Sequence, residues 1–157
     1  MVVRFIVGLT ILSYACYTDV RTRHASNYLW LLMGVVGSLL LLLQYVTVGF
    51  DNVLILSVIP MMFILSYVIF QSGLLFAGAD TKALMSLSIL VPFYVVNVFL
   101  LSILFILLVI PFLLLYYHKK YSVLYLMTKY RYPFMVNILF GFLFTFAFGN
   151  VINVWDW

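Results

Sequence analysis

Residues 70–90 read FQSGLLFAGADTKALMSLSIL, and two charged side chains, Asp80 and Lys82, interrupt a sequence that is otherwise apolar, small or uncharged. The run that follows, 83–117, is 35 residues long and contains no charge. The way in which this run is divided decides how many helices the chain forms. The whole chain has only four acidic residues, all of them aspartate, so the position of Asp80 also requires a reason.

The composition predicts an integral membrane protein. Of the 157 residues, 68% are hydrophobic and 8% are charged, whereas a soluble domain carries roughly a quarter charged residues. A chain this apolar cannot cover its surface with polar groups, so we expect its partner to be the lipid bilayer. No basic surface with interleaved aromatic residues is visible, which argues against nucleic-acid binding.

The charges divide the chain into apolar runs, most of them close to the roughly 20 residues needed to cross a bilayer. Apart from 83–117, these runs are 2–18, 28–48, 53–70 and 134–152. Arg4, near the start of the first run, is expected to extend to the membrane interface. As one helix, 83–117 would be about 50 Å long, much more than the bilayer core. Pro92 and Asn97 offer a break between two helices, and Pro111 a kink in the second.

The basic residues favour the division into two. With two helices in 83–117, the loops 19–27, 71–82 and 118–132 fall on one side of the membrane. They hold seven of the eight basic residues, which are Arg21, Arg23, Lys82, Lys119, Lys120, Lys129 and Arg131. Positive residues concentrate on the cytoplasmic side. The sequence therefore predicts an all-α polytopic protein, a single domain over 1–157 with six transmembrane helices and both termini on the extracytoplasmic side.

This topology places Asp19, at the end of the first helix, and Asp80, at the start of the fourth, at the same depth near the cytoplasmic face. Acids at membrane depth are costly and usually functional. Two carboxylates close together share a proton, so one acts as a base toward water and the other as an acid toward a carbonyl oxygen. That arrangement hydrolyses a peptide bond without a covalent intermediate. Two simpler roles remain open: Asp80 as a helix cap, and Asp19 as a partner of Arg21 or Arg23.

Other reactive groups are few. His24 and His118 have no second ligand at metal spacing, no serine lies in a GxSxG elbow, and no glycine-rich nucleotide motif occurs. Cys16 has no cysteine partner. We therefore expect no metal and no cofactor. Asp51 and Asp156 are interpreted as ordinary loop and terminal charges.

Two other classes of function compete with a peptidase. A small proton-coupled transporter would use the same two aspartates as proton carriers. Against it, the sequence has no internal repeat, and both acids lie near one face instead of the midplane typical of transporter sites. A non-catalytic assembly factor is the third class, and it predicts that neutral replacements of both aspartates retain function.

Two motifs resemble those of the type IV prepilin peptidases and the archaeal preflagellin peptidases, membrane aspartic proteases that share a GxGD-type motif with presenilin. The first is DVRTRHASN, in which Asp19 is followed by basic residues and Asn27. The second is AGADTKAL, with Asp80 and Lys82. The chain departs from the family pattern where glycines are expected: Ala77 and Ala79 occupy those positions with Gly78 between them, and Ser26 replaces a proline frequent in bacterial members.

The resemblance implies a compact peptidase without the domain that methylates the new amino terminus in larger bacterial members. Its implied substrate is a prepilin-like protein with a short basic leader and an apolar helix, cut at the cytoplasmic face. Asp19 and Asp80 become the catalytic pair, while Lys82 and Asn27 are implied to orient the carboxylates or the loops by hydrogen bonds. We further expect Gly73 and Gly78 to let the ends of the first and fourth helices separate and admit the substrate.

Overall fold

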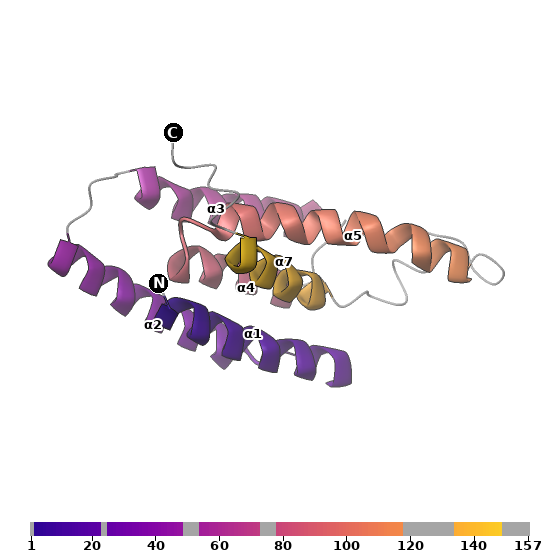
Figure 1. The fold of residues 1–157 in the computed structure, drawn as a ribbon, viewed down its shortest axis with the longest axis horizontal. Helices are drawn as coiled ribbons and strands as arrows, with labels where there is room; N and C mark the ends of the chain where they lie inside the picture. The colour runs from indigo at the N-terminus through magenta and orange to yellow at the C-terminus, as the bar shows by residue number, and fades with distance from the viewer. Residues whose placement is uncertain (1, 23–24, 49–53, 73–77, 118–133, 149–157) are drawn as a thin grey trace.

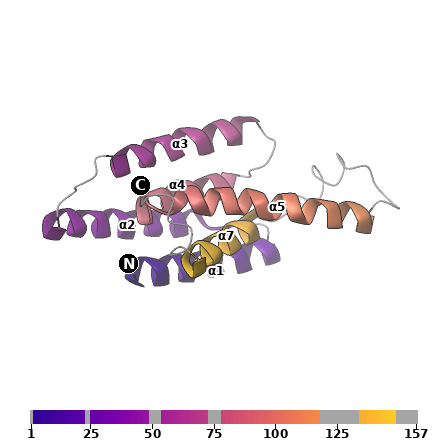
Figure 2. The ribbon, with the colours of Figure 1, turned by 45° about the horizontal axis from the view of Figure 1, so that its top comes forward.

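The computed structural model of the chain is a bundle of helices (Figure 1), and it describes residues 2–22, 25–48, 54–72, 78–117 and 134–148. The helices are α1 (Val2–Thr22), α2 (Asn27–Val48), α3 (Leu54–Ser72), α4 (Gly78–Leu90), α5 (Val95–Tyr117) and α7 (Phe134–Phe148). The described residues thus form six helices and no strand, which confirms the all-α prediction. Successive helices run in opposite directions along the long axis (Figures 1 and 2).

The long apolar run is divided where the sequence predicts. α4 ends at Leu90, a turn covers 92–94, and α5 begins at Val95. Pro92 has no N–H to continue α4, and the Val91 carbonyl instead accepts hydrogen bonds from the N–H groups of Tyr94 and Val95, both at 3.0 Å. Asn97 is not part of the break, because α5 has already begun. Pro111 lies inside α5 without ending it.

The described helices differ in length. Two of the described helices are long and apolar enough to cross a membrane on length and composition alone, α1 over Val2–Thr22 and α2 over Asn27–Thr47. α4 has only 13 residues, or about 20 Å, which is shorter than the roughly 20 residues needed to cross a bilayer. It contacts α1, α2, α3, α5 and α7 and is covered by protein along its length.

The other helices pack around α4. α2 and α3 make their largest interhelical contacts with α4, whereas α7 packs on α5 and α1. Figure 2 shows α3 at the edge of the bundle, with α4 between it and the helices α1 and α7. Many large apolar side chains, such as Leu31, Leu42, Ile64 and Leu107, are exposed on the outside. An outer surface of this kind is suited to lipid.

Two glycines allow helices to approach closely. A Cβ atom at Gly37 of α2 would lie 2.9 Å from the backbone N and Cα of Leu90 in α4. A Cβ atom at Gly141 of α7 would lie 2.6 Å from the Val98 carbonyl oxygen in α5. Small residues at such contacts are typical of helix packing in membranes, where close backbone approach replaces the hydrophobic effect.

Arg4 does not extend outward as expected. It is only 8% exposed, and its guanidinium donates hydrogen bonds to the Gln44 side-chain oxygen at 2.8 Å and to the Leu40 carbonyl at 3.2 Å. The C-terminal part of α2 therefore satisfies this charge inside the bundle. The contact also fixes how α1 and α2 are aligned along their length.

Candidate active site

Asp19 continues the inward-facing stripe of α1. The buried residues of this helix include Arg4, Gly8, Ile11 and Ala15, and Asp19 lies one further turn along, since residues four apart share a helix face. Its side chain is half-buried. The last turn of α1 thus turns a carboxylate toward the bundle and not toward the lipid-facing side.

Asp80 lies in the first turn of α4 and is only 4% exposed. Carboxylates are almost never this buried in proteins unless they are paired. The N-terminal end of a helix favours a negative charge because the unsatisfied N–H groups carry partial positive charge. The start of α4 therefore stabilises the Asp80 carboxylate. The helix-cap role that the sequence left open for Asp80 depends on the same position at the start of the helix.

The register of α1 against α4 places the two carboxylates at one level of the bundle. The two helices touch where a Cβ atom at Gly8 would lie 3.3 Å from the Leu90 side chain, and they run in opposite directions (Figure 2). From that contact, Asp19 lies about 16 Å along α1 and Asp80 about 15 Å along α4, at 1.5 Å per residue. Both aspartates thus lie near the same end of the molecule, at the same height.

Asn27 and Lys82 are brought together. The Lys82 ammonium donates a 2.7 Å hydrogen bond to the side-chain oxygen of Asn27, which joins the start of α2 to the start of α4 across 55 residues of sequence. Lys82 is exposed and Asp80 is buried, because residues two apart lie on nearly opposite faces of a helix. Lys82 therefore holds two helix ends together and does not point along the face of α4 that carries Asp80.

The remaining residues of the second motif are only partly described. A Cβ atom at Gly78 would meet the ring of Phe70 at 3.7 Å, which is ordinary contact, so packing alone does not require glycine there. Ala79 is half-buried against the core. Gly73 and Ala77 lie outside the described residues, and the expected separation of helix ends remains a prediction.

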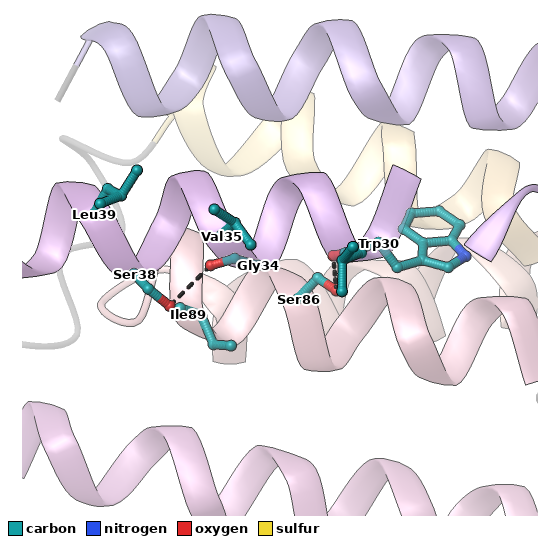
Figure 3. Close-up of a pocket in the computed structure, with 8 residues that line it drawn as sticks. Trp30, Gly34, Val35, Ser38, Leu39, Ser86 and Ile89 are labelled. Atoms are coloured by element: carbon teal, nitrogen blue, oxygen red, sulfur yellow. Dashed lines mark hydrogen bonds between the residues drawn. The ribbon is translucent and has the colours of Figure 1, made fainter. Parts of the chain in front are cut away.

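Sequence reasoning missed the next contact between α2 and α4. The Ser86 hydroxyl lies 3.0 Å from the carbonyl oxygen of Trp30 and 2.8 Å from that of Lys82. Figure 3 shows this contact at one end of a groove of about 410 Å³, which continues along α2 past Gly34 toward Leu39. The spacing in the sequence contains the signal for this contact. Trp30 is three residues after Asn27, so the two share a face of α2, and Ser86 is four residues after Lys82, so these two share a face of α4.

Comparison with known proteins identifies the family. The sequence model of the type IV leader peptidase family matches residues 6–149. The chain belongs to this family. This membership confirms the resemblance that the two aspartate motifs indicate, and it extends over nearly all of the described helices.

Two preflagellin peptidases from archaea are among the similar proteins. That of Methanococcus voltae is 33% identical over 99 residues, which cover 62% of this chain and 42% of the relative. That of Methanococcus maripaludis is 34% identical over 92 residues, covering 57% and 39%. The matched region spans about two fifths of these relatives. No solved structure matches the chain.

Proposed function

We propose that the chain is a membrane aspartic endopeptidase that removes the short basic leader of prepilin-like precursors, including type IV pilins, Flp-type pilins and archaellins. The observation that carries this proposal is the placement of Asp19 and Asp80. Both lie on inward-facing positions of contacting helices, at the same height, in a chain of the type IV leader peptidase family. The names of the two archaeal relatives support the same class of substrate.

The chemistry follows from two carboxylates that share one proton. The ionised carboxylate removes a proton from water, and the resulting hydroxide attacks the carbonyl carbon of the scissile bond. The protonated carboxylate donates its proton to the carbonyl oxygen. Collapse of the tetrahedral intermediate expels the amine, which takes up the proton that the first carboxylate removed from water, while the second carboxylate recovers its proton from the diol oxygen. Leader and mature protein are thus released without a covalent intermediate.

The location of the reaction is part of the proposal. The chain is placed in the cell membrane as a single multi-pass domain, with the Asp19 and Asp80 end at the cytoplasmic face and both termini outside. The clustering of basic residues in the loops on that side supports this orientation. A precursor with a basic leader and an apolar helix then presents its cleavage site at the height of the carboxylates.

The test is a cleavage assay in membranes with a preflagellin and a type IV prepilin as substrates. Asp19→Asn and Asp80→Asn retain size and hydrogen bonding but remove the titratable acid, so each should abolish cleavage while the protein still inserts. Asp51→Asn and Asp156→Asn are matched controls, since the same change outside the proposed pair should leave cleavage intact. A bell-shaped pH dependence is expected for a pair that works in its singly protonated form.

Normal cleavage by both site variants would eliminate the aspartic mechanism. The proton-coupled transporter would instead predict a proton flux that both variants lose, without proteolysis. No observation in the described helices favours that alternative.

A further inference from the structure

The Trp30 side chain carries a hydrogen-bond donor that nothing in the described part of the chain accepts. Trp30 is only 4% exposed, and its indole nitrogen is buried without a hydrogen-bond partner among the described residues. Leaving a buried donor unsatisfied is unfavourable, and native proteins retain few such groups. A phenylalanine would fill much of the same space without the penalty, so the N–H calls for an explanation.

The described polar groups around Trp30 do not accept a hydrogen bond from its indole N–H. The Ser86 hydroxyl, which contacts the Trp30 backbone, is directed at the carbonyl oxygens of Trp30 and Lys82. An indole N–H can only donate, so its partner must be an oxygen or another acceptor. None of the described residues supplies that acceptor. A bound molecule with an exposed oxygen would supply it.

The indole is directed toward the end of the bundle that holds the two aspartates. In Figure 3 its nitrogen lies on the side of the ring away from Gly34 and Leu39, that is, toward the start of α2. Helical side chains generally lie over the turn that precedes them, and the preceding turn of α2 begins at Asn27, which is bonded to Lys82.

The alignment of α1 with α2 also places the Trp30 ring near the end of the bundle that holds the aspartates. The two helices run in opposite directions, with Arg4 opposite Leu40 and Gln44. Counting along both helices from that contact at an equal rise per residue, Asp19 comes opposite the first turn of α2. Trp30 lies one turn further from that end, and its ring reaches back toward it.

We propose that the Trp30 indole N–H binds the main-chain carbonyl oxygen of the substrate beside Asp19 and Asp80 and stabilises it as water adds. This inference rests on the proposed peptidase function and adds a residue to it. The carbonyl oxygen gains negative charge in the tetrahedral intermediate, so a preorganised donor in a water-poor site acts most strongly at that moment. The two carboxylates supply the proton transfers, and the indole supplies a fixed dipole without exchanging its proton.

The test uses the full chain in membranes, with the preflagellin and prepilin assay described above. Trp30→Phe removes the N–H and retains an aromatic ring, and we expect kcat to fall by about 100-fold with KM nearly unchanged, as for the loss of one oxyanion donor. Replacement of Trp30 by 3-benzothienylalanine gives an isosteric ring without the N–H and should cause the same loss. This second variant decides the question if the phenylalanine variant folds poorly.

Met33→Leu is the matched control for packing. Met33 is fully buried on the same stripe of α2, one turn further from the aspartates, and it carries no donor. Its substitution should leave kcat within about twofold, because volume-conserving apolar changes are well tolerated.

The outcomes separate this inference from the proposed function. Wild-type kcat in the benzothienylalanine variant, or an equal loss in Met33→Leu, would overturn the role of the indole while Asp19→Asn remained inactive. A rise in KM with unchanged kcat would also overturn it, because the N–H would then bind the ground state and the transition state equally. Normal cleavage by Asp19→Asn and Asp80→Asn would instead remove the peptidase mechanism itself.

Discussion

Alanine at Gly37 should separate α2 from α4, whereas alanine at Gly34, one turn earlier, should not. A Cβ atom at Gly37 would lie 2.9 Å from two backbone atoms of Leu90 and 3.1 Å from the carbonyl carbon of Ile89. The nearest atom to a Cβ at Gly34 is the end of the Ile89 side chain, at 4.0 Å. The same substitution on one helix thus meets backbone in one case and ordinary contact in the other.

The magnitude follows from these distances. Carbon atoms in contact prefer separations of about 3.5–4.0 Å, so α2 must move away from α4 by about half an ångström or more. Because backbone cannot rotate aside, we expect Gly37→Ala to lower the free energy of unfolding by about 1–3 kcal/mol, the usual penalty for overpacking. Gly34→Ala has no such clash and gains helix propensity, so its effect should be between about zero and 1 kcal/mol of stabilisation.

Equilibrium unfolding in mixed micelles, followed by far-ultraviolet circular dichroism as the denaturing detergent is increased, measures this difference. Cleavage of a preflagellin should fall in Gly37→Ala as well, since the shift of α2 carries Trp30 and Asn27 with it. Equal unfolding midpoints for the two variants would refute the packing argument, because they would mean that α2 and α4 do not approach as closely as the Gly37 contact requires.

Two further predictions concern the polar contacts of α2. Asn27→Ala and Lys82→Met should each reduce kcat/KM by about two- to fivefold, the range of an exposed polar pair. The double variant should be no less active than the poorer single variant. Additive losses in the double variant would show that the two residues act separately. Arg4→Met leaves the Gln44 side-chain oxygen and the Leu40 carbonyl without their buried donor. It should reduce the free energy of unfolding by about 1–3 kcal/mol in the same micelle titration, with Arg21→Met, an exposed change on the same helix, as its control.

The sequence predicts the helices well because the features that decide them are local. Charges end the apolar runs, and Pro92 cannot continue a helix, so the division of 83–117 into α4 and α5 follows from the chain itself. The shortness and burial of α4 do not follow. Hydropathy cannot distinguish an apolar residue that faces lipid from one that faces protein, since both environments favour the same side chains.

For the candidate site, too, the sequence predicts some of the residues and not others. Asp19, Asp80, Asn27 and Lys82 stand out because polar groups are rare in this composition, and the hydrogen bond between Asn27 and Lys82 confirms that two of them meet. Trp30 does not stand out, because an aromatic residue near the end of an apolar helix is expected in any membrane protein. Only its burial and its unpaired N–H within the described helices distinguish it from an interfacial anchor.

The relative height of the two aspartates is set by contacts far from them. Asp80 lies in the first turn of a short helix that is held by the close approach of Gly37 to Leu90. Asp19 lies in the last turn of α1, which is held at its other end by the hydrogen bonds of Arg4. Both contacts lie some 15 Å or more from the carboxylates at 1.5 Å per residue, and a rigid helix transmits any displacement along its axis. Substitutions at the opposite end of the bundle should therefore alter cleavage without contacting the substrate. The first effect should be on kcat, and the pH profile of the aspartate pair should change only with larger displacements.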